Sequence, residues 1–253
     1  MTPSLDIVFP LYPGVTFLDF IGPQATFLLL PGARLTFASL GGQPIHEGSL
    51  TLTSLAKLEE LERCDVLCVP GGPSGDMIQN EAFMAALRRL GGSARFITSV
   101  CTGSLLLAAA GLLEGKRAAC HWAMRDLLAG FGAIPDPGRV VRDGNVLTGG
   151  GVTAGIDFGL TLAAELAGPL TAQTIQLMLE YAPEPPFHAG RPDTAPPEVL
   201  AHVQTFIPPS VDIEGDRATV QRLAAGARRS AAGGPGRGAD QPGLYSEPCA
   251  PQG

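Results

Sequence analysis

Residues 97–106 read ITSVCTGSLL, and this stretch decides the fold. An apolar strand runs into Cys101, small residues follow at once, and a helix begins after them. A nucleophile on so tight a strand-to-helix turn is typical of the elbow of α/β enzymes. The sequence therefore predicts a nucleophilic Cys101 at the carboxyl end of a central strand. The alternative is a structural cysteine at a strand end, since buried cysteine is common.

The residues after the elbow favour reactivity of the sulfur. Gly103 permits a close approach of the backbone, and the helix that begins there directs its free N–H groups and positive dipole end at Cys101. Such a position lowers the pKa of a thiol. We therefore expect Cys101 to be a thiolate.

Apolar runs alternate with helical patterns along most of the chain, which is typical of a doubly wound sheet. The fold class is predicted to be α/β and flavodoxin-like, with a mostly parallel sheet and helices on both faces. Two runs that are apolar almost throughout should be its central strands. The central strands are predicted to be Val66–Val69 and Phe96–Val100. The other predicted strands are Leu5–Phe9, Leu35–Ser39 and Val146–Thr148. The predicted helices are Gly75–Leu90, Gly103–Leu113, Trp122–Ala129, Ala154–Leu166 and Ala172–Tyr181.

The chain is predicted to consist of one catalytic domain and an extension. An Asp143-Gly144 pair between apolar runs indicates an antiparallel hairpin at the sheet edge. The catalytic domain should span residues 1–205, with Pro-rich coil near its end. Residues 206–230 should form an extension with one weak helix, about Arg217–Arg229. Residues 231–253 are rich in Gly and Pro, which predicts a disordered tail.

Composition excludes several classes of function. A net charge of −7 opposes a nucleic-acid partner, because that affinity rests largely on Lys and Arg. The chain has no targeting segment at its start and no apolar stretch of membrane-spanning length, so we expect a cytoplasmic protein without a membrane partner. Five cysteines without a paired motif predict reduced thiols, no metal and no cofactor. The Gly-rich run 148–154 lacks the G-x-G-x-x-G frame, which excludes a nucleotide site.

A second loop should lie beside Cys101. Gly71 and Gly72 follow the strand Val66–Val69, and the carboxyl ends of parallel strands open at one edge of a sheet. Their backbone N–H groups, together with that of Thr102, are candidates for an anion hole. A Gly-Gly pair is also common in an ordinary turn between strand and helix.

The third candidate is Asp19, the carboxylate in LYPGVTFLDFIGP, residues 11–23. Its neighbours are apolar, and desolvation raises the pKa of a carboxyl toward neutrality. Beside a thiol, such a group can exchange protons with the thiol or with a substrate. The alternative is that Asp19 only caps a helix.

These three segments together resemble the DJ-1/PfpI superfamily: LDFxGP near the start, PGG after one strand and VCTGS after the next. The resemblance covers about residues 5–200. Within the superfamily, further segments are similar to the isonitrile hydratases. They are GKRAACHW (115–122), RVVRDGN (139–145), TGGGVTAGID (148–157) and QLMLEYAP (176–183).

The resemblance implies a cofactor-independent hydro-lyase that works as a homodimer. Its substrate would be a small isonitrile, attacked by Cys101 to give a thioimidate and then an N-substituted formamide, with Asp19 orienting water and moving protons. Thr102 stands where the peptidase-like branch has a His, which argues against protease activity. Gly150 is expected to lie near the site, where bulk at Gly149, Gly150 or Gly151 would disturb it. His121 is the nearest replacement base, although a His at a helix start is more often a structural donor.

Two other interpretations remain open. A ligand-sensing or redox-protective DJ-1-like protein would bind a ligand or oxidise Cys101 without turnover. AraC-type regulators of the superfamily share the CTG elbow, but the residues after 205 cannot hold their helix-turn-helix domain. Another cysteine-dependent hydrolase or a glyoxalase-like enzyme would use the same nucleophile on a different substrate.

Overall fold

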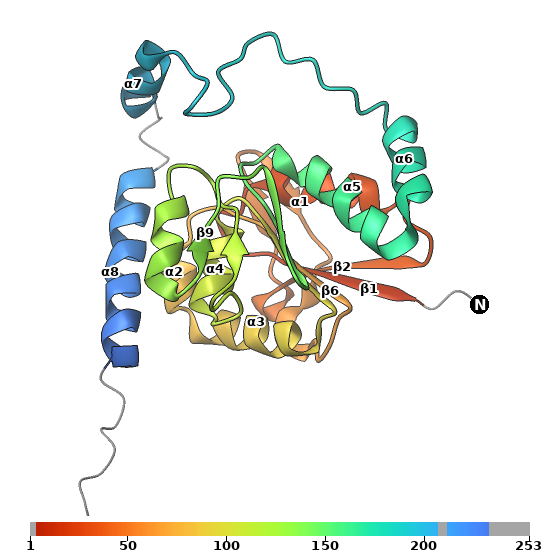
Figure 1. The fold of residues 1–253 in the computed structure, drawn as a ribbon. Coiled ribbons are helices and arrows are strands. Elements are labelled where there is room, and N and C mark those ends of the chain that lie inside the picture. The colour runs from red at the N-terminus through yellow and green to blue at the C-terminus, as the bar shows by residue number, and fades with distance from the viewer. Residues whose placement is uncertain (1–3, 207–211, 233–253) are drawn as a thin grey trace, which may run out of the picture.

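The computed structural model of the chain describes residues 4–206 and 212–232, and its core is a seven-stranded sheet (Figure 1). The strand order is β10-β11-β7-β6-β1-β2-β5, and all neighbours are parallel except the β10–β11 pair. The flavodoxin-like α/β fold is confirmed. The strands are β1 (Leu5–Pro10), β2 (Ala33–Ser39), β5 (Ala56–Lys57), β6 (Val66–Val69), β7 (Phe96–Val100), β10 (Val140–Asp143) and β11 (Val146–Gly149).

Helices cover both faces of this sheet. Figure 1 shows α1 (Phe17–Phe27) and α5 (Ala154–Ala167) side by side on one face and α3 (Glu81–Ser93) on the other. Every residue of β6 is buried, because helices exclude water from both of its faces. The remaining elements are η1 (Leu40–Gly42), β3 (Ile45–Glu47), β4 (Leu50–Leu52), η2 (Leu58–Glu60), α2 (Gly75–Gln79), α4 (Gly103–Ala109), β8 (Arg117–Ala118), η3 (Arg125–Phe131), β9 (Ile134–Pro135), α6 (Pro169–Met178), α7 (Pro197–Phe206) and α8 (Ile213–Ala232).

Three predicted helices differ from the observed ones. The helix predicted over Gly75–Leu90 is two helices, because the Asn80 side chain accepts a hydrogen bond from the Phe83 N–H at 3.1 Å and starts α3 afresh. The α4 helix stops at Ala109, two residues before Gly111 adopts a positive φ. The segment predicted as a helix from Trp122 forms the 3₁₀ helix η3 instead. The hairpin is confirmed, with β10 and β11 antiparallel.

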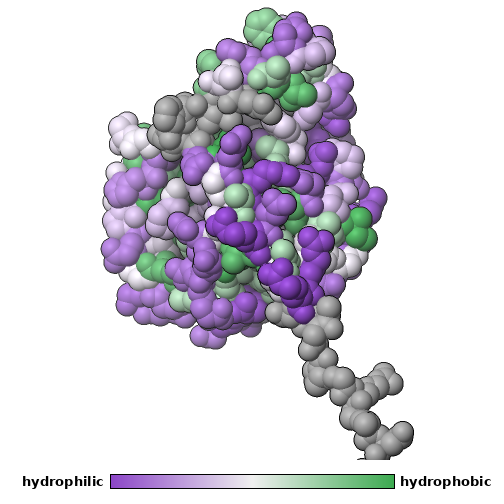
Figure 2. Space-filling view, turned by 90° about the vertical axis from the view of Figure 1, so that its left-hand side faces the viewer, coloured by the Kyte–Doolittle hydropathy of each residue, from purple (hydrophilic) through white to green (hydrophobic). Residues whose placement is uncertain are grey.

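The C-terminal helix α8 packs on η3 and α2. It includes the segment predicted as helix, Arg217–Arg229, and begins four residues earlier. Val220 and Ala224 on its inner face are 0% and 2% exposed, and a side chain at Gly130 of η3 would collide with Ala224. Figure 2 views the molecule from the α8 side, where hydrophilic residues predominate. The predicted tail 231–253 lies outside the described residues from residue 233 onward.

Two charged residues fix α8 to the rest of the fold. The Asp216 carboxylate accepts hydrogen bonds from the N–H groups of Ser74, at 3.0 Å, and Gly75, at 2.6 Å. These amides start α2, directly after the loop that follows β6. Arg217 binds Asp126 in η3 at 2.5 Å and lowers the pKa of that carboxyl. The helix therefore holds both the start of α2 and the 3₁₀ helix η3.

Replacing Asp216 by Ala should destabilise the fold, because it leaves the partly buried Ser74 and Gly75 N–H groups without their acceptor. The free energy of unfolding should fall by about 1–3 kcal/mol, measured by urea denaturation. Glu214→Ala removes the same charge from an exposed position on the same helix and should change it by no more than about 0.5 kcal/mol. Equal losses in the two variants would show that the Asp216 contacts contribute nothing specific.

Candidate active site

Cys101 lies at the turn between β7 and α4 in a strained conformation. Its φ is 59°, in the left-handed region that residues with a side chain seldom adopt. Its N–H donates to the Gly149 carbonyl at 3.1 Å, which attaches the turn to the end of β11. The elbow thus directs the Cys101 side chain to the carboxyl edge of the sheet.

The ends of β6 and β7 approach each other so closely that only glycine fits between them. A side chain at Gly103 would collide with the Val69 carbonyl oxygen, and one at Gly71 would lie 2.6 Å from the Thr102 nitrogen. These two glycines bring the loop after β6 against the elbow. The two loops therefore lie side by side, as the sequence predicts.

Asp19 is fully buried in α1, and only one of its two carboxyl oxygens has a partner. Oδ2 accepts a hydrogen bond from the Gly71 N–H at 2.8 Å. Oδ1 is buried and has no hydrogen-bond partner within the described part of the chain. Burial raises the pKa of this carboxyl to about 7, although the Gly71 N–H and a hydrogen bond with the Cys101 side chain oppose the shift. The Asp19 carboxyl is therefore placed to exchange a proton with the Cys101 side chain.

The Cys101 thiol lies beside this carboxyl, and the pKa of the thiol is raised, whereas the sequence predicts a lowered pKa. Cys101 is 6% exposed, and both its burial and the Asp19 carboxylate raise the pKa of the thiol well above the usual value. The Thr102 N–H favours the thiolate but does not outweigh them. The prediction of a resting thiolate is therefore wrong: desolvation exceeds the attraction of one N–H group.

The other buried cysteines are protonated for the same reason. Burial raises the pKa values of Cys64, Cys68 and Cys120 to about 12. All of these thiols, like Cys101, are free of disulfides. What distinguishes Cys101 is its strained turn and the carboxyl beside it.

The two glycine amides are already engaged. The Gly71 N–H donates to Asp19, and the Gly72 N–H donates to the Thr102 hydroxyl oxygen at 2.8 Å. That hydroxyl in turn donates to the Gly72 carbonyl at 2.7 Å. The predicted anion hole from Gly71 and Gly72 is therefore corrected: these amides position Asp19 and Thr102, since a donor with a protein acceptor is not free for substrate.

A cavity of about 490 Å³ adjoins this cluster, and Gly150 and His121 line it. Cys120 lines it too and is close enough to Cys101 to influence the pKa of its thiol. Cys101 and Asp19 are not on the cavity wall. The cavity is lined by Cys120, His121, Trp122, Arg125, Pro137, Gly138, Arg139, Gly150, Gly151, Val152, Thr153, Gly190, Arg191, Pro192 and Asp193.

His121 and the glycines after β11 are placed as wall residues. The His121 Nδ1 accepts the Ala123 N–H at 3.4 Å, and burial lowers the pKa of the ring, so a neutral imidazole faces the cavity. A methyl group at Gly149, Gly150 or Gly151 would meet no atom closer than 3.5 Å. The expectation that any bulk here disturbs the site is wrong for an alanine, because space remains.

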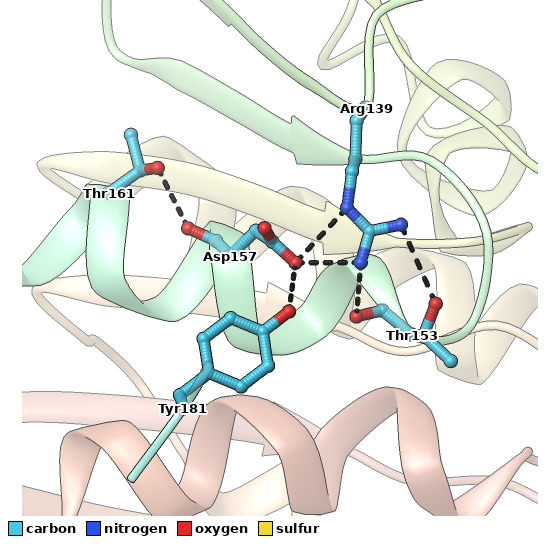
Figure 3. A network of polar contacts seen from close by, with 5 residues as sticks. All are labelled: Arg139, Thr153, Asp157, Thr161 and Tyr181. Atoms are coloured by element: carbon cyan, nitrogen blue, oxygen red, sulfur yellow. Dashed lines mark hydrogen bonds and ion pairs between the residues drawn. The ribbon is translucent and has the colours of Figure 1, made fainter. Parts of the chain in front are cut away.

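A polar network on the cavity rim was not predicted from the sequence. Arg139 donates to Asp157 Oδ2 at 2.7 Å, and the Tyr181 hydroxyl donates to the same oxygen at 2.7 Å (Figure 3). Arg139 also donates to the Thr153 carbonyl at 3.0 Å. The three side chains come from the segments RVVRDGN, TGGGVTAGID and QLMLEYAP. The sequence analysis singles out these three segments, but the sequence alone does not indicate that their side chains meet.

Within residues 4–206 and 212–232, no three His, Cys, Asp or Glu side chains cluster in a way that could hold a metal ion. Over the same part of the chain, none of the helices combines the length and the apolar character that a membrane span requires.

Comparison with known proteins gives a consistent result. The sequence profile of the DJ-1/PfpI family matches residues 6–165. An isonitrile hydratase of Pseudomonas putida is 48% identical over 212 residues, which cover 83% of this chain and 93% of that enzyme.

Solved structures agree with this match. A ThiJ/PfpI family protein from Pseudomonas syringae superimposes with a TM-score of 0.81 at 40% identity, over 87% of this chain and 90% of that one. DJ-1beta of Drosophila melanogaster superimposes with a TM-score of 0.63 at 26% identity, over 71% of this chain and all of that one.

Titration of Asp19 should make stability depend on pH. Since burial raises the pKa of its carboxyl from 3.8 to about 7, the folded state keeps a proton that the unfolded state releases between these values. The Asp19 contribution to the free energy of unfolding should therefore fall as the pH rises from about 4 to 7, by at most about 4 kcal/mol, and stay constant above. The Asp19→Asn variant has no carboxyl at this position, so its free energy of unfolding lacks this pH-dependent contribution. Urea denaturation of both proteins near pH 4, 6 and 8 measures it, and a pH-independent difference between them would contradict the raised pKa.

Alanine should be tolerated at Gly150 but not at Gly103. Gly103→Ala should abolish folding or lower the free energy of unfolding by about 3 kcal/mol or more, because its methyl group meets backbone oxygens that cannot move away cheaply. Gly150→Ala has room for its methyl group and should stay within about 1 kcal/mol of the original chain. Thermal denaturation of both variants measures this difference in stability. Similar melting temperatures would refute the tight approach at Gly103.

Proposed function

Because the chain belongs to the DJ-1/PfpI family, we propose that it is an isonitrile hydratase, which adds water to an isonitrile and releases an N-substituted formamide. The observation that carries the proposal is the buried Asp19 carboxyl, held by the Gly71 N–H on one oxygen and facing the Cys101 thiol as a hydrogen-bonding neighbour. The similarity to the Pseudomonas putida enzyme supports the choice of substrate class. A homodimer in the cytoplasm, working without cofactor, is part of the proposal on the same basis.

The first step needs a nucleophile and a proton, and the pair supplies both. The Asp19 carboxylate takes the proton of the Cys101 thiol while the sulfur attacks the isonitrile carbon. The protonated Asp19 then delivers this proton to the same carbon. A carbon–sulfur bond and a carbon–hydrogen bond form, giving a neutral thioimidate, so no net charge is left in a site of low dielectric.

The second step returns the enzyme to its starting state. Water attacks the thioimidate carbon, and Asp19 accepts a proton from it. Asp19 passes this proton to the nitrogen, which had none, the carbon–sulfur bond of the adduct breaks, and the formamide leaves with one hydrogen on its nitrogen. The sulfur recovers the remaining proton, so the overall reaction consumes one isonitrile and one water.

The acidity of the pair favours this proton transfer over redox sensing. Cysteine oxidation follows thiolate character and exposure, and Cys101 is both protonated and buried. A carboxyl whose pKa is about 7 is instead well suited to general acid–base catalysis near neutral pH. Thr102 and the glycine loop act by holding Asp19 and the elbow in place.

Purified protein, treated with chelator, should convert aryl and alkyl isonitriles to formamides, followed by absorbance or mass. Cys101→Ala should have no turnover, and Asp19→Asn should lose at least ~10²-fold, the lower end of general acid–base contributions. Cys64→Ala, at a buried cysteine just before the amino end of β6 and so at the opposite end of this strand from the site, should stay within a few fold. Full activity of Cys101→Ala would overturn the nucleophile, and full activity of Asp19→Asn would overturn the proton shuttle.

The rate should also report the protonation of the pair. Turnover requires one shared proton, which means an ionised Asp19 beside a protonated Cys101. As the pH falls through about 7, Asp19 becomes protonated and can no longer accept the thiol proton. The value of kcat/KM should therefore drop about tenfold per pH unit below about 6.5 and stay level above 7.5. A rate that rises as the pH falls would contradict this assignment.

A further inference from the structure

The cavity beside the active site has a positive wall. Arg125, Arg139 and Arg191 line it, whereas Asp193 is the one acidic residue among its described lining residues. Burial keeps His121 neutral, so it adds no charge. The volume of about 490 Å³ lies within the range of small-molecule sites.

Arg125 is the cation on this wall that has no counterion within residues 4–206 and 212–232. Arg139 is paired with Asp157 and Arg191 with Asp193, at 2.7 and 3.1 Å. Asp126, the acid next to Arg125 in sequence, is bound to Arg217 instead. The Arg125 side chain has no hydrogen bond or ion pair to any described residue, and the residue is partly buried. A partly desolvated guanidinium without a partner is a strong binding group for a carboxylate.

The position of Arg125 relates the cavity to the reacting sulfur. Its charge acts on the Cys120 thiol, and Cys120 in turn acts on Cys101. Gly149, whose carbonyl binds the Cys101 N–H, leads directly into the cavity residues Gly150 and Gly151. An isonitrile group is linear and narrow, which suits a reacting carbon that has to reach past the wall residue Cys120 to the buried Cys101 sulfur.

The wall also offers an apolar surface for the body of such a molecule. Trp122 lines the cavity and is 38% exposed, with its ring centroid 5.7 Å from that of His121. An aromatic side chain beside an arginine suits a ligand that has a flat apolar part and an acidic end.

We infer that the substrate is an isonitrile that carries a carboxylate, and that Arg125 binds this carboxylate while the isonitrile carbon meets Cys101. The inference rests on the proposed function for the reaction, but the anion site can be measured separately. Arg125 is thus a specificity-determining residue that takes no part in the proton transfers.

The test compares 4-isocyanobenzoate with phenyl isocyanide, which differ only in the carboxylate. The original chain should show a kcat/KM at least about tenfold higher for the acid. Arg125→Gln should lower kcat/KM for the acid by about tenfold to a hundredfold, mainly through KM, and leave phenyl isocyanide within about twofold. Arg88→Gln removes the same charge from the exposed side of α3 and should change neither.

The retained rate on phenyl isocyanide shows that the Arg125→Gln protein is folded. Equal kcat/KM for the two substrates, or an equal loss on both in Arg125→Gln, would overturn the inference while the proposed function stands. If neither isonitrile is turned over, the proposed function fails, and calorimetry with 4-formamidobenzoate against formanilide still decides the anion site. Binding of the acid that is absent, or unchanged in Arg125→Gln, would then overturn it.

Discussion

The site depends on the close approach of two chain segments at the carboxyl edge of the sheet. Gly103 lies against the Val69 carbonyl, and Gly71 lies against the Thr102 nitrogen, with no room for a side chain at either position. This approach lets the Gly71 N–H reach the buried Asp19 carboxyl on a third segment. One steric constraint therefore brings the elbow, the glycine loop and the carboxyl together.

The same constraint determines the acidity of the pair. A carboxyl that is sealed under two loops loses its hydration, and one N–H group returns only part of it, so the pKa of Asp19 comes to lie near 7. The thiol beside it is protonated because a buried thiolate next to a carboxylate would place two negative charges in a medium of low dielectric. The pair therefore shares one proton near neutral pH, and the chemistry proposed above uses that proton twice.

The C-terminal helix extends this arrangement outward. Asp216 holds the amides that follow the glycine loop, and Arg217 holds η3, which carries the cavity residue Arg125. The loop after β6 and η3 are thus attached to a segment that is more than a hundred residues away along the chain from the elbow and lies outside the matched family region. A weakly apolar helix is stable here because two buried side chains, the hydrogen bonds of Asp216 and the ion pair of Arg217 attach it to the fold.

The sequence by itself determined the fold class, the central strands, the elbow at Cys101 and the segment that holds Asp19, because strand periodicity, glycine positions and segment order are local properties. The tertiary structure decided what depends on burial and on distant partners. It raised the pKa of the Cys101 thiol, engaged the Gly71 and Gly72 amides, and left room at Gly150. It also united Arg139, Asp157 and Tyr181 and gave Arg125 no counterion among the described residues. Desolvation and pairing depend on which groups meet in space, and no local pattern in the sequence encodes that.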